Sequence, residues 1–364
     1  MTRISVSLVT AGIVALAGCG GASLTKVGPV GRAPSVRANG PIAYERYAGA
    51  SIDDSSAQIF LRTPGGAVHQ LTRVRGGAFA PAWSPSGTRI AFEHGAPAGR
   101  HLIYSMNPDG TGVRPLATGC TAASRCVLDA FPAYSPDGER VSFERVYGPI
   151  VHREDPGGGG TVDYAARVDL MVVDARGGAP TAIARWGTDP QPWDGAPRWA
   201  PDGTRLVLPL GTFQHHNMHT ILGTALVVVD ARGGAQQRIT SWDLGAGNPD
   251  WSPDGQHIVF NSEGGHSRST YVVRPDGHGL QRLLAGGAAL SHLGDTTAPA
   301  WSPDGRQIVF TTEPRRCGSL HLNACRNVAY TFDVYVMNAD GTHVHAITSA
   351  PQFEARPAWG RIQG

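Results

Sequence analysis

The sequence lacks the short motifs that identify most nucleotide-binding proteins and many hydrolases. It has no P-loop, no G-x-G-x-x-G fingerprint, no H-E-x-x-H zinc motif and no G-x-S-x-G nucleophile elbow; residues 265–269 come nearest to an elbow but end in serine. It also lacks a cluster of basic residues, and its net charge is only +2 at pH 7. Because nucleic-acid binding depends on such clusters, we do not expect it here.

The chain does contain six copies of one motif, P-x-W-S-P-D-G-x-x-I-x-F. Each copy is typical of a β-hairpin, with an apolar strand that contains Trp or Tyr, a turn, and a second strand of alternating apolar residues. S-P-D-G suits the turn because Pro fixes its own φ, Asp bonds nearby backbone and Gly adopts positive φ. The copies begin at Pro81, Pro132, Pro197, Pro249 and Pro299, and a shortened sixth occupies residues 356–360.

Two more short apolar runs follow each hairpin, so each repeat holds four antiparallel strands, the content of a propeller blade. The N-terminal residues 41–45 match a second strand without its first, and Pro357-Ala358-Trp359 match a first strand without its second. Joining the two completes a sixth blade. We therefore predict an all-β fold, a six-bladed propeller of four-stranded antiparallel blades. It is closed by pairing of the N- and C-terminal strands, which removes open edges.

The repeated motif resembles that of the TolB-type, WD-like β-propellers, from Pro41 to Trp359. The resemblance implies the fold but says little about function, because the family includes binding scaffolds, lyases and peptidase-associated propellers. TolB itself carries an α/β domain ahead of its propeller, and residues 20–39 are too few for one. The role of TolB is therefore not carried over to this chain.

Residues 1–19 have the organisation of a bacterial lipoprotein signal peptide. Arg3 precedes an apolar stretch, and Leu16-Ala17-Gly18-Cys19 resembles the lipobox, whose cysteine is lipidated; an ordinary secretory signal is the alternative. Residues 20–39 are then a flexible tether and residues 40–364 the propeller. We predict an exported monomer in the cell envelope. The lipid on Cys19 would hold it on the outer side of the cytoplasmic membrane or in the outer membrane.

Four further cysteines fall into two close pairs, Cys120 with Cys126 and Cys317 with Cys325. Export favours disulfides, and each pair brackets a short loop. We therefore predict two local disulfides. The alternative is a cysteine metal site, but the sequence has no C-x-x-C to support it.

The repeat places the loops on two faces of the propeller. The turns between strands one and two and between strands three and four are short and uniform, and they share one face. The other connections, which carry every long insertion, lie on the opposite face, which we call the elaborated face. Because function usually resides in variable loops on a rigid scaffold, we expect any site there, at the mouth of the central channel. Tolerated insertions are the alternative.

Two groups of polar residues on this face are candidate ligand sites. His215, His216 and His219 could ligate a transition metal; an ordinary polar loop is the alternative. The second group precedes the first strands and could ring the channel mouth to bind Ca²⁺ or another cation, a basic peptide or a sugar amine. Turn formation is the alternative for these residues. The group consists of Asp129, Asp194, Asn248, Asp295 and Glu354.

The tryptophans divide into two sets. Those of the repeated motif are expected to pack within and between blades. Trp186 and Trp193 lie outside the repeat position, in an insertion, so we predict that they are exposed for contact with sugar or protein.

Together these features favour a non-enzymatic scaffold that binds an envelope protein or a glycan and needs no cofactor. The alternative is a metal-dependent polysaccharide lyase or hydrolase that uses His215, His216 or His219. Oligogalacturonate lyases of the same propeller type use a His-rich metal centre, although their motif does not align with confident spacing here. Bound metal would favour the enzyme.

Overall fold

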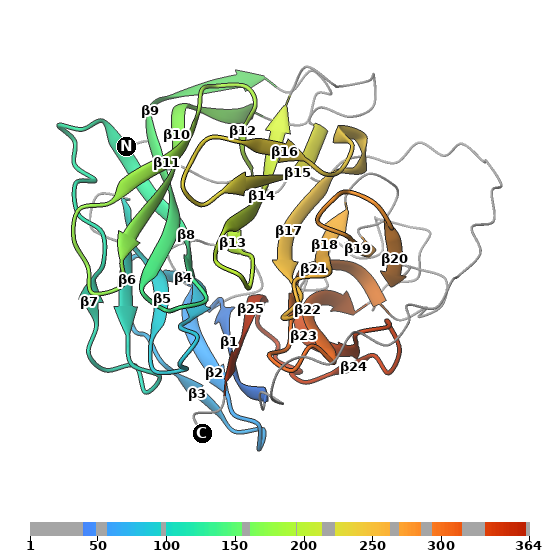
Figure 1. The fold of residues 1–364 in the computed structure, drawn as a ribbon. Coiled ribbons are helices and arrows are strands. Elements are labelled where there is room, and N and C mark those ends of the chain that lie inside the picture. Colours follow the sequence, from blue (N-terminus) through green and yellow to red (C-terminus); the bar gives the residue numbers. More distant parts are fainter. Residues whose placement is uncertain are drawn as a thin grey trace.

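The computed structural model describes residues 39–48, 57–95, 100–154, 161–193, 195–212, 223–262, 269–284, 293–314 and 332–361. Within these ranges the chain forms strands β1 to β25 and a short 3-10 helix, η1 (Trp242–Leu244). The strands make six antiparallel sheets arranged around a centre (Figure 1), which confirms the predicted six-bladed propeller. Across the same ranges no helix has the length and apolar character that crossing a bilayer requires.

We number the blades 1 to 6 and give their strands from the channel outwards. Blade 1 consists of β25 (Glu354–Arg361), β1 (Asn39–Arg46), β2 (Gln58–Arg62) and β3 (Val68–Gln70). Blade 2 consists of β4 (Ala78–Trp83), β5 (Ile90–Gly95), β6 (His101–Met106) and β7 (Arg114–Pro115). Blade 3 consists of β8 (Cys126–Tyr134), β9 (Arg140–Glu154), β10 (Thr161–Asp174) and β11 (Thr181–Trp186).

Blade 4 has a divided inner strand. It consists of β12 (Gln191–Pro192) and β13 (Arg198–Trp199), then β14 (Arg205–Thr212), β15 (Gly223–Asp230) and β16 (Gln236–Arg238). Blade 5 consists of β17 (Ala246–Trp251), β18 (Ile258–Ser262), β19 (Ser269–Val273) and β20 (Gln281–Leu284). Blade 6 consists of β21 (Leu293–Trp301), β22 (Gln307–Pro314), β23 (Asp333–Asn338) and β24 (His345–Ala346).

The two ends of the described chain close the ring in blade 1. The C-terminal β25 pairs antiparallel with β1, with Ile42 opposite Trp359 and Ala43 opposite Ala358. Figure 1 shows these blue and red strands side by side. The closure also buries apolar surface between blades, because Ile42 and Tyr44 pack with Ala300 and Val309 of blade 6.

The inner strands share a β-bulge just before the proline of the motif. The residue ahead of that proline has a positive φ of 46° to 56° in five blades, and the pairing register slips there by one residue or more. These residues are Ala80, Phe131, Asn248, Ala298 and Arg356. The bulge removes their N–H groups from the regular ladder, so the N–H groups need other acceptors.

The second strand of the preceding blade supplies that acceptor in three blades. The N–H of Ala80 donates to Glu45 Oε1 at 2.7 Å, and the N–H of Phe131 donates to Glu93 Oε1 at 2.8 Å. At the corresponding position of blade 5, Asn261 Oδ1 accepts from the N–H of Ala298 at 3.4 Å. The residue that follows the aromatic at the end of the second strand therefore joins neighbouring blades through this hydrogen bond.

The motif tryptophans also link blades, as predicted. Trp199 Nε1 donates to the carbonyl of Ala133 at 3.2 Å, and Trp251 Nε1 donates to the carbonyl of Arg198 at 3.1 Å. In each case the acceptor lies on the inner strand of the preceding blade. Arg140 of blade 3 lies over the Trp199 ring with 4.8 Å between its Cζ and the ring centroid, which adds a cation–π contact across the junction.

Candidate functional site

The central channel is almost filled by side chains of the inner strands. Its lining comes from all six blades and consists mainly of the bulge residues and the prolines that follow them. The cavity between these described residues is ≈ 20 Å³, about the room for one water molecule. Sites for small molecules are usually about 300–1,000 Å³, so this cavity is too small to hold a substrate.

On one side of the channel, the positive charge of Arg356 is balanced by the carboxylate of Glu45. Arg356, on the bulge of β25, lies over the Phe131 ring at 5.4 Å and is 3.4 Å from Glu45 Oε2. Tyr47 donates its hydroxyl hydrogen to the same Glu45 oxygen at 3.0 Å. Burial raises the pKa of Glu45, and Arg356 opposes that rise. These contacts use both oxygens of the carboxylate, because the other one holds the blade 2 bulge.

The opposite side of the channel carries an ion pair that joins three blades. Arg198 and Asp250 stand directly after the motif proline, where the other blades have alanine, and Arg198 Nε is 3.8 Å from Asp250 Oδ1. The other carboxylate oxygen accepts the N–H of Trp301 in blade 6 at 2.8 Å. Burial raises the pKa of Asp250 to about 6, against the opposing effect of Arg198.

This shift predicts a pH dependence that is specific to Asp250. A folded-state pKa of about 6, above the ordinary 3.8, means that the folded protein holds this proton more tightly than the unfolded chain. The stabilisation is therefore present at acidic pH and is lost as pH rises through about 6. Relative to Asp250→Asn, the wild type should lose about 2 kcal/mol of unfolding free energy between about pH 4 and pH 7. Urea titrations of both proteins measure it; parallel pH profiles would contradict the assignment.

Of the predicted ring of polar residues, Asp129 and Glu354 do not lie at the channel mouth, whereas Asn248 does line the channel. Asp129 and Glu354 are fully buried and bind arginines on the neighbouring strand of their own blade. Asn248 is itself a bulge residue and lines the channel. Residue counts before the proline misplace these side chains because the bulge shifts the register. Asp194 and the side chain of Asp295 lie outside the described residues.

Asp129 instead begins a row of alternating charges across blade 3. Arg145 stands directly opposite Asp129, Asp169 opposite Arg145, and Arg185 opposite Asp169. Arg145 bonds Asp129 with both Nε and Nη2, at 2.7 and 2.8 Å. Burial raises the pKa of both Asp129 and Asp169, and the arginines oppose it. The row therefore holds two buried carboxylates in place.

Blade 1 repeats the first step of this row. Arg46 stands opposite Glu354 and its Nη2 lies 2.6 Å from Glu354 Oε1. Thr348 also donates its hydroxyl hydrogen to this carboxylate. Blades 1 and 3 thus carry their acids as structural ion pairs and not as groups available to a ligand.

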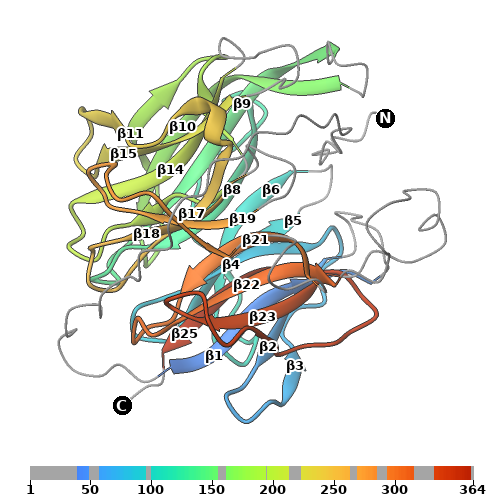
Figure 2. The same ribbon diagram turned by 90° about the vertical axis from the view of Figure 1, so that its right-hand side faces the viewer.

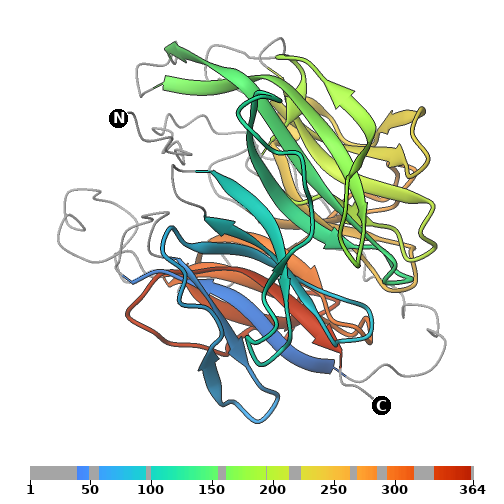
Figure 3. The same ribbon diagram turned by 90° about the vertical axis from the view of Figure 1, so that its left-hand side faces the viewer.

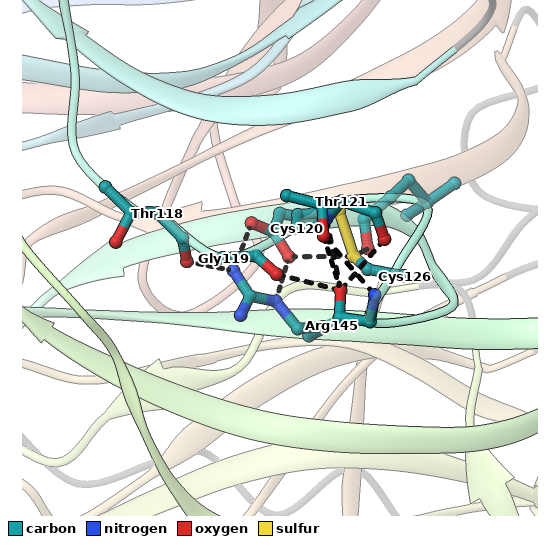
Figure 4. Close-up of a disulfide and its surroundings, with 9 residues drawn as sticks. Thr118, Gly119, Cys120, Thr121, Cys126 and Arg145 are labelled. Atoms are coloured by element: carbon teal, nitrogen blue, oxygen red, sulfur yellow. Dashed lines mark hydrogen bonds and ion pairs between the residues drawn. A yellow bond between two sulfur atoms is a disulfide. The ribbon is translucent and has the colours of Figure 1, made fainter.

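A disulfide lies beside the row. Cys120 and Cys126 are joined, with their Cα atoms 5.0 Å apart, as predicted for this pair (Figure 4). Arg145 Nη2 donates to the carbonyl of Thr118 at 2.9 Å and so ties the loop to blade 3. Cys120, Cys126 and Asp129 also form a group of metal-ligand type. It suits a metal poorly while the sulfurs are bonded to each other and Asp129 binds Arg145.

The prediction for Trp186 is wrong. Its side chain is buried in the blade 3–blade 4 core, and its Nε1 donates to Gln236 Oε1 at 3.2 Å. Alternation of Ala182, Ala184 and Trp186 along β11 is the signal that could have shown this. Trp193 is half-buried, and its N–H donates to the carbonyl of Pro209 at 3.1 Å. Cys19, His215, His216, His219, Cys317 and Cys325 lie outside the described residues.

In the part of the elaborated face that the structure describes, a two-stranded ribbon projects from blade 3. β9 and β10 have 15 and 14 residues, whereas β8 has 9 and β11 has 6. The β8 pairing ends at Tyr147 of β9, and the β11 pairing begins at Val168 of β10. Beyond these points β9 and β10 pair only with each other in the described structure, from Ile150–Ala165 to Glu154–Thr161. We call residues 150–154 and 161–165 the β9–β10 arm; Figures 2 and 3 show it extending past its blade.

The sequence did not predict this arm, because residues 146–167 read only as one of several long insertions.

The root of the arm is held by polar contacts. The Arg167 guanidinium lies over the Tyr147 ring at 3.7 Å, and Arg167 Nε is 3.1 Å from Asp169 Oδ1. The root of the arm is therefore tied to the charge row through Asp169.

No family model matches the chain. TolB from Acinetobacter baumannii is similar over 90% of this chain and 68% of its own, with a TM-score of 0.62 and 16% identity. A putative TolB from Agrobacterium tumefaciens is similar over 89% and 99%, with a TM-score of 0.56 and 17% identity. An oligogalacturonate lyase in complex with manganese is similar over 87% and 75%, with a TM-score of 0.50 and 17% identity. At these identities the likeness is one of fold: this chain is a six-bladed propeller similar to TolB-like propellers.

Proposed function

We propose that this protein is a binding scaffold of the bacterial cell envelope that engages a protein or a glycan through its elaborated face. The observation that carries the proposal is the β9–β10 arm. The closed ring holds the root of the arm, and both of its long edges lack a neighbouring strand in the described structure. Unpaired strand edges are ready templates for another chain.

The energetics of the arm support the same function. An isolated two-stranded ribbon is only marginally stable in water, and a third strand or a packed face stabilises it. The arm receives no third strand from blade 3, because the pairing of β8 and of β11 stops at its root. A partner that adds a strand to one edge would supply the missing hydrogen bonds. A protein partner is thus favoured over a glycan at this position.

The small cavity in the channel, and acids that already pair with arginines, give no support to catalysis at the propeller axis. The cavity there is ≈ 20 Å³, and Asp129, Glu45 and Glu354 already bind arginines. Their placement suits a rigid framework. Function is then placed on the loops that the framework carries.

Envelope attachment is part of the proposal and rests on the sequence. The Leu16-Ala17-Gly18-Cys19 lipobox would anchor the chain through a lipid on Cys19, and residues 20–39 would tether the propeller to the membrane. A tether of this kind places the propeller among envelope proteins and raises their effective concentration.

A metal-dependent lyase is the second candidate, favoured by the fold shared with a lyase that binds manganese. Its ligands would be His215, His216 and His219. Mass spectrometry of the purified chain, beside a variant with all three changed to Ala, separates the candidates. About one tightly bound transition metal per chain, lost in the variant, would favour the lyase.

The scaffold is tested with a chain whose arm is removed at its root. Because Ile150 stands opposite Ala165, residues 151–164 can be replaced by Asn-Gly, which closes a two-residue hairpin turn there. Both proteins are produced from Gly20 onwards, without the lipidated Cys19. The chain with the intact arm should then bind isolated envelope membranes saturably, and the shortened chain should bind at least about tenfold more weakly at an unchanged melting temperature. Equal saturable binding by both proteins would exclude the arm as the contact.

A further inference from the structure

A groove on the outer rim, away from the channel and the β9–β10 arm, lies at the junction of blades 4 and 5. Its volume is ≈ 430 Å³, which is within the range of small-molecule sites. One wall is the end of β16 with residues 238–241 and η1, and the other is the β19–β20 turn with Asp276 and His278. β16 and β20 are labelled in Figure 1.

The floor of the groove is apolar. Val273 is fully buried and Ile239 nearly so, and Leu244 of η1 packs against the same blade 5 core. Leu280, at the rim, is 49% exposed. The apolar surface that a ligand can reach is that of Leu280 and of the half-buried Leu244, and an apolar body of a few carbons that covers it would gain hydrophobic stabilisation.

The donors of the groove face solvent: Arg238 and Ser241 are exposed and Thr240 is half-buried. Arg238 lies over the Trp242 ring at 5.4 Å and has no carboxylate partner within the described part of the chain. Thr240 accepts the N–H of Leu226 at 2.8 Å, as Thr72 accepts the N–H of Ile59. Thr72 also donates its own hydrogen to Gln58 Oε1, whereas no acceptor for the Thr240 hydrogen occurs among the described residues.

Two further polar side chains line the groove, the Ser241 hydroxyl and the Asp276 carboxylate. Ser241 is the N-cap residue of η1, yet its side chain makes no cap bond. Asp276, the carboxylate among the lining residues, is already bonded by the N–H of His278 and lies 3.7 Å from Arg274. The groove thus offers one uncompensated positive charge and two hydroxyl donors above an apolar floor.

We propose that this groove is a binding site for a small organic carboxylate with an apolar body. The carboxylate would accept hydrogen bonds from Arg238 and from the Thr240 and Ser241 hydroxyls, and the body would lie on Leu244 and Leu280. Charge-assisted bonds to a carboxylate are the strongest that these donors can make. The site is independent of the proposed scaffold function.

The test uses 4-phenylbutanoate as the carboxylate and 4-phenylbutan-1-ol as its neutral match, titrated into the full chain and followed by ligand-observed NMR. For an acid of this size we expect a Kd of about a millimolar, with binding of the alcohol at least about tenfold weaker. Arg238→Ala should weaken binding of the acid by about tenfold or more, and Ser241→Ala by a smaller factor.

Arg232→Ala is the matched control, because Arg232 is exposed on the neighbouring β15–β16 turn and does not line the groove. It should leave the Kd unchanged, and all three variants should keep the wild-type melting temperature. The proposal is overturned if the acid and the alcohol bind equally, if Arg238→Ala binds the acid as wild type does, or if wild type shows no binding at about 10 mM.

Discussion

Replacing Arg145 by Ala should lower the unfolding free energy by about 3–5 kcal/mol at neutral pH. The substitution leaves Asp129, which is 0% exposed, as a buried carboxylate without its bidentate partner. It also removes the bond from Arg145 to the carbonyl of Thr118, which anchors the disulfide loop. Urea denaturation followed by circular dichroism measures the loss.

The pH dependence of this loss identifies its cause. Burial already raises the pKa of Asp129, and losing Arg145 raises it further. A carboxyl with a raised folded pKa stabilises the fold only while it is protonated, so the deficit of the variant should shrink as pH falls towards 4. A deficit that does not change with pH would point to lost packing instead.

Two further variants test whether the buried charge of Asp129 causes the loss. The double variant Asp129→Leu/Arg145→Met removes both charges at similar volume and should be more stable than Arg145→Ala alone. Arg176→Ala breaks an exposed pair with Asp174 on the same blade and should have no measurable effect. A double variant less stable than the single one would contradict the account of Asp129.

Ending the chain at Pro351, which removes β25, should abolish cooperative unfolding. Blade 1 would lose its innermost strand, and β1 would expose the edge that now pairs with β25 from Glu354 to Arg361. Tyr44 and Ile42 would lose the Trp359 side of their core. Far-UV circular dichroism during thermal unfolding should therefore show a broad, non-cooperative transition and increased aggregation.

A chain that ends at Arg361 is the control, because it keeps every described residue of β25. It should unfold like the full chain. A synthetic peptide of residues 352–361, added to the shortened chain, should restore a cooperative transition by refilling the strand. A shortened chain with the full-length midpoint would show that ring closure by β25 does not hold the fold together.

The architecture was predictable because the repeat encodes the same local choices six times. S-P-D-G marks each turn, alternating apolar residues mark each second strand, and incomplete copies at the two ends indicate where the ring closes. Period-two patterns and turn residues are local signals that need no knowledge of tertiary contacts. The linking role of Trp199 and Trp251 was predictable for the same reason.

The candidate site was less predictable because it depends on register. The bulge before each motif proline leaves Asp129 and Glu354 opposite Arg145 and Arg46, inside their blades. A comparison among the repeats could have indicated this: Asp129 and Glu354 belong to the two blades in which the aromatic residue of the second strand is followed by Glu-Arg. In blade 1 the paired strands come from opposite ends of the chain, so a single copy of the motif cannot show the pairing.

The arm and the groove could not be predicted from the sequence for a second reason. The length of residues 146–167 was visible, but whether an insertion becomes a loop or an extended ribbon depends on pairing between its two halves. The donors at Arg238, Thr240 and Ser241 are ordinary residues in the sequence. They line a groove only because the β19–β20 turn of blade 5 stands opposite them.

Site-specific photo-cross-linking in living cells tests the central claim most directly. A photoreactive amino acid at position 152 lies on the β9–β10 arm, and one at position 202 lies on the short turn of the opposite face. The account predicts a discrete adduct with one envelope protein from position 152 and none from position 202. Adducts from position 202 alone, or from neither position although the protein is folded and exported, would contradict a scaffold that works through the arm.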